Sequence, residues 1–488
     1  MRPLDDAEER ALVAGVEAQP FATILSVSDL HLGVGIDDKT GRYMPLENFL
    51  SDGGFSRFLI NQQTTLPGPH LLVLNGDILD FLRIAIAPNH QQIEAWAERL
   101  NAFGDPRTAA DLRATIERHE AEYGLQSDDF KSLWKLDVMA AGHPVFFSAL
   151  AAWLRNGGTI AYTRGNHDPE QYWPLIRRAF RDIVSGFGVD VASVQERIVF
   201  VDDAFCVANV MFQHGHLYER LTRMDNPPIR PKATQLELPL GSLVNRYVVN
   251  KLERISPFLD NMTPVMDMVL AAIKQHPFLT FTLVRRSSRL LVRALARRRG
   301  NSFLLAASLL GLALSHLIPV LVVVLALLYG TSPTVRDWLN SWLSRPWLRT
   351  VLGVVGVLLP VLVRKAIALI SRRRKYREGE NDFAGGALAE LRRRFVRPVP
   401  WPTVYAVLGH THAEDVQDLP ALPGARRTLY LNTGTWIPRW PKDRPDLIGR
   451  VLLTFVRFTR YDNSYAHEMV RWDDSGGVAR EATILAPR

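Results

Sequence analysis

The chain has 488 residues, of which 47% are apolar and 22% are charged. This length and composition favour two to four folded domains and exclude a wholly disordered chain. The single cysteine, Cys206, excludes an intramolecular disulfide and a cysteine-based zinc site. Because Cys206 lies in an apolar run, we expect it to be an inert residue of a buried strand, and a reducing compartment fits this cysteine usage.

The net charge of +8 is unevenly distributed along the chain. Residues 217–400 contain 29 Lys and Arg against 11 Asp and Glu, whereas the remainder contains 29 against 39. Such a basic stretch attracts nucleic acid or an anionic membrane surface. Residues 1–19 include several acidic side chains and no apolar core, which argues against a signal peptide.

Five short apolar runs each lead into a polar motif. The runs cover residues 22–28, 71–74, 159–163, 207–213 and 404–408. Short apolar runs bounded by turn residues predict buried strands, and side chains just past such strand ends form the ligand sites of α/β folds. The motifs are Asp29-Leu30-His31, Asn75-Gly76-Asp77, Arg164-Gly165-Asn166-His167-Asp168, His214-Gly215-His216 and Gly409-His410-Thr411-His412.

Residues 81–157 show the apolar spacing of helices, for example at Ile93, Trp96 and Leu100. We expect a helical excursion near the site. It would be either a solvated decoration or a cap that faces the substrate.

Residues 301–371 carry the strongest apolar signal in the chain. No charged residue occurs from Asn301 to Val335, a run long enough to span a bilayer, and a second, shorter run covers 350–363. If motifs before and after this stretch share one site, the number of membrane crossings must be even. The sequence therefore favours a two-helix membrane hairpin with a connecting loop around residues 336–349, and a soluble, buried helical hairpin with a basic rim is the alternative.

Arginine clusters flank this hairpin, at residues 285–299 and 372–377. The positive-inside rule places both flanks, and with them the catalytic residues, on the cytoplasmic side of the membrane. No aromatic stacking platform accompanies the clusters, which favours anionic lipid over nucleic acid. We expect residues 217–300 to form a basic, amphipathic helical segment that approaches the membrane, and residues 372–400 to form a basic linker.

The motifs together supply three carboxylates, six histidines and two asparagines beside predicted strand ends. Oxygen and imidazole ligands in combination suit Mn²⁺, Fe, Zn²⁺ or Mg²⁺. A lone aspartate in a tight Gly-Asp turn, such as Asp77, can bridge two such ions. The sequence therefore predicts a site for two divalent metal ions, without deciding which metal.

These five motifs, in this order, resemble those of the calcineurin-like metallophosphoesterase superfamily, over roughly residues 20–216 and 400–440. The resemblance implies an α/β fold of two packed mixed β-sheets flanked by helices, an αββα sandwich, here with the inserted helical membrane hairpin. Residues 20–216 and 401–488 would then be the two parts of one catalytic domain.

The resemblance also implies a role for each motif residue. Asp77 would bridge the two ions, and a metal-bridging hydroxide would attack phosphorus in line. His167 would be the general acid beside the leaving oxygen, and Asp80 would orient it; a turn cap and a helix-start carboxylate are the respective alternatives. The remaining metal ligands would be Asp29, His31 and His412 for the first ion and Asn166, His214 and His410 for the second.

Several residues beside the motifs have open roles. His216 could lie on the substrate side or support the ligands. Arg83 and Arg164 could clamp a phosphate or form ordinary surface pairs. Residues 432–436 read as a strand and turn that support the site structurally.

The Asp-Leu-His-Leu sequence at 29–32 is also similar to UDP-2,3-diacylglucosamine pyrophosphatases, which cleave a lipid-linked diphosphate at a membrane surface. His167 and His216 depart from that subgroup, which has Arg and Asp at the matching positions. We therefore expect a membrane-anchored phosphoesterase that acts on a phosphorylated substrate, with a lipid-linked one as an option. A nucleotide or nucleic-acid phosphodiesterase and a non-catalytic membrane scaffold are the alternatives.

Overall fold

The computed structural model describes residues 1–37, 39–224, 227–229, 233–254, 258, 261–263, 332–344, 382–441 and 445–482. The chain divides into one unit of Met1–Ser288 and Phe383–Arg488 and a second unit of Arg289–Asp382. The hairpin expected over residues 301–371 lies outside the described residues except at 332–344. There, where we expect a loop, the structure has helix α15 (Pro333–Leu343), which begins at a proline suited to a first helical turn.

The larger sheet of the first unit has seven strands in the order β16-β15-β14-β1-β4-β5-β6. Its parallel strands are β1 (Thr23–Val27), β4 (His70–Asn75), β5 (Thr159–Thr163) and β6 (Ile198–Val201). Its antiparallel strands are β14 (Thr454–Tyr461), β15 (Ser464–Asp473) and β16 (Val478–Glu481). The C-terminal strands thus complete a sheet that the N-terminal part begins.

The smaller sheet has five strands in the order β11-β12-β10-β8-β7. They are β7 (Ala204–Val207), β8 (Val210–Gln213), β10 (Thr403–Leu408), β11 (Glu414–Leu419) and β12 (Arg427–Thr433). The single strand expected over 207–213 is in fact the end of a hairpin, because Ala208 takes a positive φ and turns the chain between β7 and β8. Cys206 lies in β7, where burial raises the pKa of its thiol to about 12.

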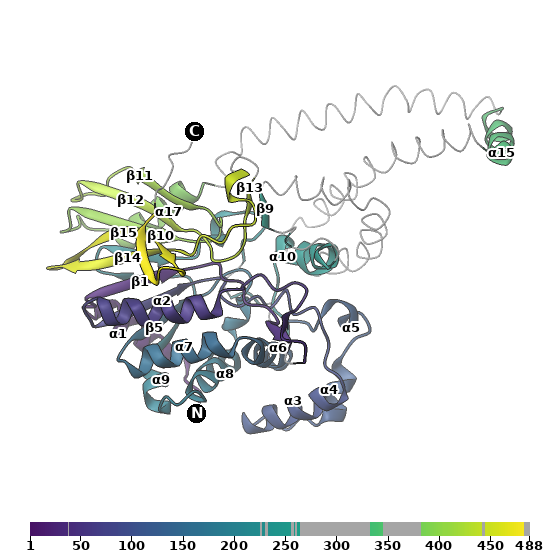
Figure 1. The fold of residues 1–488 in the computed structure, drawn as a ribbon, viewed down its shortest axis with the longest axis horizontal. Helices are drawn as coiled ribbons and strands as arrows, with labels where there is room; N and C mark the ends of the chain where they lie inside the picture. The colour runs from purple at the N-terminus through teal and green to yellow at the C-terminus, as the bar shows by residue number, and fades with distance from the viewer. Residues whose placement is uncertain are drawn as a thin grey trace. The chain divides into compact units, whose positions relative to one another are not determined.

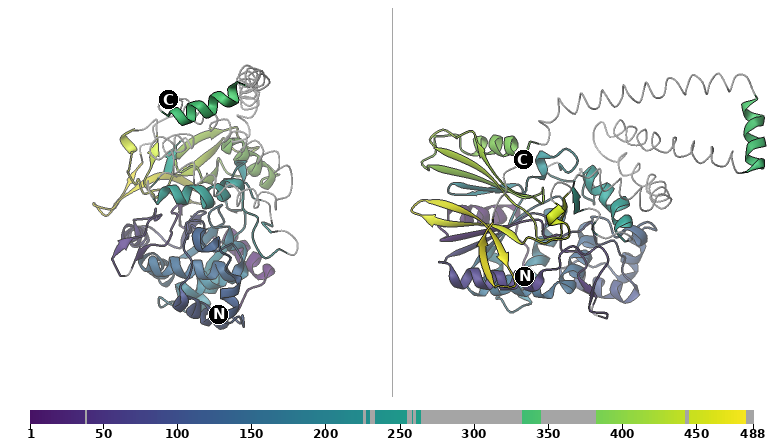
Figure 2. Two further views of the ribbon diagram at one scale, coloured as in Figure 1. Left: turned by 90° about the vertical axis from the view of Figure 1, so that its right-hand side faces the viewer. Right: turned by 45° about the horizontal axis from the view of Figure 1, so that its top comes forward.

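Helices cover the outer faces of the two sheets (Figures 1 and 2). Against the larger sheet lie α2 (Asp52–Thr65), α6 (Asp129–Gly142), α7 (Pro144–Arg155), α8 (Pro174–Ser185) and α9 (Val191–Arg197). Helix α17 (Phe383–Arg394) packs on the smaller sheet through Ala387, Leu388 and Leu391. Helix α1 (Asp6–Ala18) contributes Val16 to the core between the sheets. The predicted α/β class, with mixed sheets flanked by helices, is confirmed.

Alternation along the strands explains why the layers form. In β1, Ile24 packs into the core between the sheets, whereas Leu25 packs against the helices on the other side. In β4, Leu71 and Val73 face the core between the sheets, and Leu72 faces the helices on the other side. Because both faces of these central strands are covered, apolar side chains occur at consecutive positions along them.

The excursion at 81–157 contains five helices, and four of them contribute to the core. They are α3 (His90–Ala102), α4 (Ala109–Thr115), α5 (Glu120–Tyr123), α6 and α7. Leu133 of α6 and Leu150 of α7 are fully buried in the cluster that underlies the larger sheet. Among the described residues no single helix has the length and apolar composition to cross a bilayer; the pair α6 and α7, bent by 89° at their junction, passes on those criteria together.

Residues 234–254, here called the docked segment, pack against the rest of the first unit. They include α10 (Leu240–Val244), a turn of π-helix (Asn245–Val249) and α11 (Asn250–Glu253). The sequence predicts that Leu240, Leu243 and Leu252 form a membrane-facing stripe, but they are at most 7% exposed in the structure. The expectation of an amphipathic approach to the membrane is therefore wrong for this part, because an apolar stripe packs equally well on protein.

Candidate metal centre

Five loops meet at one edge of the sheets, each at the carboxyl end of a strand. They follow β1, β4 and β5 of the larger sheet and β8 and β10 of the smaller one. Backbone hydrogen bonds join them: Asp29 N donates to Gly76 O at 3.1 Å, and Gly409 N donates to His214 O at 2.9 Å. Residues far apart in the sequence therefore lie side by side.

The backbone is strained at this edge. The residues Asp29, His31, Asp77, His410 and His412 have φ values between 52° and 73°. They are half of the ten non-glycine residues with positive φ in the described part of the chain. Such a conformation costs an L-residue about 1–2 kcal/mol, and strained residues persist where their surroundings hold them, commonly at functional sites.

Two motif glycines allow the loops to approach closely. A Cβ atom on Gly165 would collide with the amide and carboxylate of Asp77. A Cβ atom on Gly409 would collide with Ser28 and with the carboxylate of Asp29. Glycine at these two positions is therefore part of how the carboxylates reach the site.

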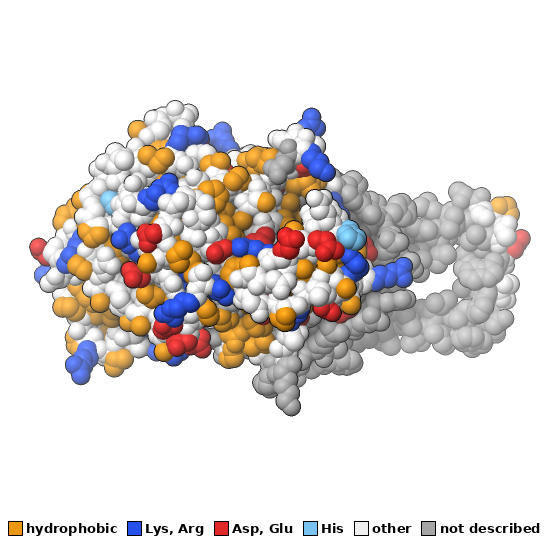
Figure 3. All heavy atoms as spheres, turned by 90° about the horizontal axis from the view of Figure 1, so that it is seen from below, with side chains coloured by type: hydrophobic (Ala, Val, Ile, Leu, Met, Phe, Trp, Pro, Cys, Tyr) orange, Lys and Arg blue, Asp and Glu red, His pale blue; other side chains and the backbone are white. Residues whose placement is uncertain are grey.

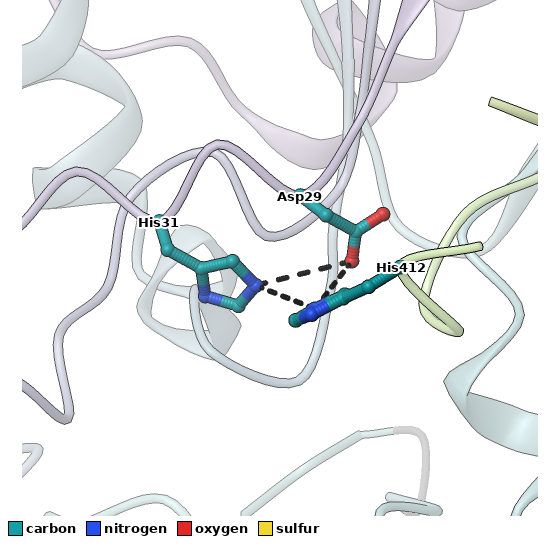
Figure 4. Close-up of side chains that lie close together, drawn as sticks. All are labelled: Asp29, His31 and His412. Carbon is teal, nitrogen blue, oxygen red and sulfur yellow. Dashed lines mark hydrogen bonds and ion pairs between the residues drawn. The ribbon is translucent and has the colours of Figure 1, made fainter. Parts of the chain in front are cut away.

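Asp29, His31 and His412 form the first group of candidate ligands (Figure 4). Nε2 of His412 lies 3.0 Å from Nε2 of His31 and 3.4 Å from Oδ1 of Asp29. Nε2 of His31 lies 3.9 Å from the same oxygen. Asp29 and His31 are buried, while a quarter of the His412 side chain is exposed. Three ligand atoms thus converge on a volume that one cation could occupy.

Asp77, His214 and His410 form the second group. Nε2 of His214 lies 3.1 Å from Oδ2 of Asp77 but makes no hydrogen bond, while its Nδ1 faces the carbonyl oxygen of Asn75 at 2.9 Å. Nε2 of His410 lies 2.7 Å from Glu219 Oε2. Glu219 engages Nε2 of His410, which makes Nδ1 the ring nitrogen suited to a metal.

Asn166 lies beside this second group. Its neighbour His167 donates its backbone N–H to Oδ1 of Asp77 at 2.7 Å. The side-chain oxygen of Asn166 is buried and has no hydrogen-bond partner among the described residues. A buried amide oxygen without a partner costs about 1–3 kcal/mol, and a hard cation is a partner that would satisfy it.

Asp80 connects two histidines. Its Oδ2 lies 3.0 Å from Nδ1 of His31 and 2.9 Å from Nδ1 of His167. These contacts fix both rings, so that Nε2 of His31 faces Asp29 and His412. Asp80 is fully buried and His167 is partly exposed. The side chains of His31, Asp80 and His167 also lie close enough together to hold a metal ion. Here, however, the Asp80 carboxylate contacts Nδ1 of both histidine rings directly.

The electrostatics keep the carboxylates ionised. Burial alone would raise the pKa of Asp77, but the charges of His214 and His167 lower it well below its usual value. Burial raises the pKa of Asp80 too, and His167 and His31 outweigh it, so that its pKa is lowered.

The histidines differ from one another. Burial lowers the pKa of His31, which leaves a lone pair on its ring at neutral pH. Burial also acts to lower the pKa of His214, but the charge of Asp77 prevails and raises it to about 9.

Sequence reasoning missed three supporting residues. Glu219 holds His410, as described. The Asp168 carboxylate accepts hydrogen bonds from Gly165 N at 2.6 Å and Ile78 N at 3.0 Å, and so joins the loops after β4 and β5. Burial and the charge of Asp77 raise the pKa of Asp168 to about 7. Its place inside the quoted Asn-His-Asp motif was the signal, whereas Glu219 lies outside every motif.

Glu47 is the third missed residue. Its carboxylate accepts hydrogen bonds from Gly33 N at 3.0 Å and Gly35 N at 2.7 Å, and so holds the turn that follows His31. Nε2 of His143 lies 3.2 Å from Glu47, and its Nδ1 lies 3.0 Å from Asp52. No sequence pattern links these three side chains.

The residues with open roles are placed as follows. Arg83 is buried between Asp80 and Glu253 and is not a surface pair. Arg164 is buried, with Asp202 at 3.3 Å. His216 is buried, and burial together with the charge of His214 holds its pKa well below the usual value.

The strand and turn expected at residues 432–436 support the loops that follow β10 and β1. Asn432 donates to Gly409 O at 2.7 Å, and the hydroxyl of Thr435 donates to Asp29 O at 2.6 Å. Trp436 anchors the turn by donating to Thr454 O at 2.7 Å. These contacts are structural.

Six of the seven expected ligands therefore lie together in two adjacent groups, with Asn166 beside the second, and the set suits a pair of divalent ions. Carboxylate, imidazole and amide donors suit such ions. The unpartnered oxygen of Asn166 adds an observation of this structure that a metal explains. No family model matches this chain, and none of the curated proteins with which it was compared matches it either.

Proposed function

We propose that this chain is a hydrolase of phosphate esters or diphosphates that uses two divalent metal ions, as its resemblance to calcineurin-like metallophosphoesterases implies. One observation carries the proposal: two ligand groups lie at one edge of the sheets, and an aspartate–histidine pair lies beside them. Asp29, His31 and His412 would hold one ion. Asn166, His214 and His410 would hold the other, and Asp77 would contact both.

When bound, two divalent ions supply Lewis-acid stabilisation of the phosphoryl oxygens and activation of water. The side chains of the protein supply the rest. His167 would donate a proton from Nε2 to the leaving oxygen. Asp80 holds Nδ1 of His167 at 2.9 Å, which fixes the ring and stabilises its protonated form. Five of these ligands have a positive φ, a strained conformation that the surrounding structure holds in place before the substrate binds.

Nucleic acid is the less favoured substrate. On the face shown in Figure 3, Lys and Arg side chains are interspersed with Asp and Glu rather than gathered into one basic field. A phosphate-tracking protein needs such a field. Nucleotides, lipid-linked diphosphates and phosphoproteins therefore stay as substrate classes, and a non-catalytic scaffold is the remaining alternative.

The test is turnover of p-nitrophenyl and bis-p-nitrophenyl phosphate by the full-length protein with Mn²⁺. We expect hydrolysis that a chelator abolishes and that Asp77→Ala lowers at least a hundredfold, about 3 kcal/mol of barrier. The matched control is Asp418→Ala, because Asp418 is an exposed aspartate of β11 that pairs only with Arg427 among the contacts described. Binding of Mn²⁺ without turnover on any phosphate substrate would support the scaffold instead.

We further propose that the chain is attached to the cytoplasmic membrane through residues 301–371, with the catalytic unit in the cytoplasm. The support is the charge-free sequence from Asn301 to Val335 and its arginine-rich flanks. The contact between His31 and His412 requires an even number of crossings between them. The protein should stay in the membrane fraction after a high-salt wash and leave it only with detergent; release by salt alone would contradict attachment by a span.

A further inference from the structure

Arg83 and Glu253 extend the Asp80–His167 pair into the docked segment. Nε of Arg83 lies 3.2 Å from Oδ2 of Asp80, and Nη1 of Arg83 donates to Oε2 of Glu253 at 2.6 Å. The side chains of all three are at most 2% exposed. Asp80 is therefore linked through one buried guanidinium to the last residue of α11.

The oxygen that Arg83 faces is the one that fixes the histidines. Oδ2 of Asp80 lies within 3.2 Å of Nδ1 of His31, Nδ1 of His167 and Nε of Arg83. The other oxygen accepts the backbone N–H groups of Leu82 and Arg83, each at 3.1 Å. The direction in which His167 points thus depends on where this carboxylate lies.

Docking of the segment does not depend on Glu253 alone. The side chain of Asn250 donates to Leu82 O at 2.7 Å, and Nη2 of Arg246 donates to Leu125 O at 2.7 Å. The hydroxyl of Ser242 contacts Asn166 O at 3.4 Å. Because these bonds fasten the segment at other points, a conservative change at Glu253 should leave it in place.

We propose that Arg83 and Glu253 are positioning residues for the general acid His167, and that the docked segment is thereby part of the catalytic apparatus. This inference rests on the proposed hydrolysis and deepens it. Removing the Glu253 charge takes one buried carboxylate partner away from Arg83, and the guanidinium then shifts relative to Asp80. His167 loses its alignment with the leaving oxygen, whereas the ligands of the second ion are unaffected.

The chain offers a matched control pair elsewhere. Arg181 of α8 is buried and pairs with Glu9 of α1, at 2.5 and 2.8 Å. Neither residue contacts the candidate ligands in the described structure. Glu9→Gln therefore removes a charge from an equally buried Arg–Glu pair without touching Asp80.

The first experiment compares phosphate monoesters whose leaving groups differ in pKa, with Mn²⁺-loaded full-length protein. Glu253→Gln should lower kcat for phenyl phosphate about tenfold more than for p-nitrophenyl phosphate, because a poor leaving group needs the proton more. The KM values should stay within about twofold of the wild type. Glu9→Gln should change kcat for both substrates by the same factor, as an effect on folding would.

The second experiment is a double-mutant cycle. In a His167→Asn background, Glu253→Gln should cause no further loss of kcat, because the group that it positions is gone. Equal losses on both substrates, or losses that multiply in the cycle, would overturn the inference while leaving hydrolysis established. A wild-type protein that neither binds Mn²⁺ nor hydrolyses either ester would contradict the proposed function and this inference together.

Discussion

Nε2 of His31 and Nε2 of His412 lie 3.0 Å apart, although the two residues are 381 positions apart in the sequence. Two imidazole nitrogens at this distance share a proton or share a cation. His31 has a lowered pKa, so its ring does not hold a positive charge of its own at neutral pH. A divalent ion beside Asp29 would replace the shared proton, and the pair is thus already arranged for it.

Metal affinity should depend on pH through His214. The pKa of His214 is raised to about 9, so a proton occupies the ring below that pH and competes with the ion. Affinity for Mn²⁺ should therefore increase between about pH 6.5 and about pH 9, by up to tenfold per pH unit for the ion that His214 binds. Calorimetric titration in buffers of different ionisation enthalpy should show proton release. Affinity that is constant over this range would contradict the assignment of His214.

Asn166→Ala should separate metal binding from stability. Its buried oxygen has no partner among the residues that the structure describes, so its removal should lower the free energy of unfolding of the metal-free protein by less than about 1 kcal/mol, if at all. The number of Mn²⁺ ions bound per chain should fall toward one.

Asn209→Ala is the matched comparison, because Asn209 donates to Thr403 O at 2.9 Å and to Tyr465 O at 3.0 Å. It should destabilise the fold by about 1–3 kcal/mol and leave the number of bound ions unchanged. The reverse pattern, with Asn166→Ala destabilising and metal binding intact, would remove Asn166 from the ligand set.

Much of the fold could be predicted from the sequence because the signal is local. The run at 159–163 has apolar side chains at its three central positions, which is typical of a strand covered on both faces, and it matches β5 residue for residue. The hairpin at Ala208 was missed, because neither Ala208 nor Asn209 is a strong turn signal beside so many apolar neighbours. The side on which Leu243 packs was also not predictable, since hydrophobic spacing does not distinguish lipid from protein.

The turn at Thr435 should support the first ion. Thr435→Val removes the hydrogen bond to Asp29 O, at a cost of about 1 kcal/mol. Because Asp29 has a strained backbone, the change should also weaken binding of the first ion about tenfold, as loss of a supporting contact commonly does.

Thr454→Val is the control for this change. The Thr454 hydroxyl is buried without a hydrogen-bond partner, so its removal should be neutral or stabilising and should leave metal affinity unchanged. Thermal unfolding and Mn²⁺ titration measure both effects. Equal metal affinities in the two variants would show that Thr435 does not support the site.

His143 should make stability depend on pH. Burial acts to lower its pKa, but hydrogen bonds with Asp52 and Glu47 prevail and raise it to about 9. The stability that it contributes is therefore complete below its unfolded value of about 6.5 and is lost as pH rises through about 9.

His143→Gln should lower the free energy of unfolding by about 3 kcal/mol at pH 6.5 and by much less near pH 10. Urea unfolding at the two pH values measures the difference. His70→Gln is the control, because His70 contacts a backbone carbonyl, Leu66 O, at 3.0 Å and no carboxylate in the described structure. A His143→Gln loss that is the same at both pH values would show that this ring is not charged.

The candidate site could be predicted only in part. The candidate ligands could be predicted from motifs, because Asp29, Asp77 and His214 each closely follow an apolar run that marks a strand end. The residues that hold these ligands in place could not be predicted. Glu219 meets His410 across 191 positions of sequence, and only the pairing of β8 with β10 brings them together. Contacts of this kind depend on the register of two strands, which no local pattern specifies.

The central claim is that two ions held by these ligands are needed for hydrolysis. The most direct measurement follows bis-p-nitrophenyl phosphate hydrolysis by the metal-free full-length protein as Mn²⁺ is added, with bound metal determined in the same samples. We predict little turnover below one ion per chain and full turnover at two, with Asp77→Ala inactive throughout. Full activity at one ion or none, or no activity with two ions bound, would contradict the account.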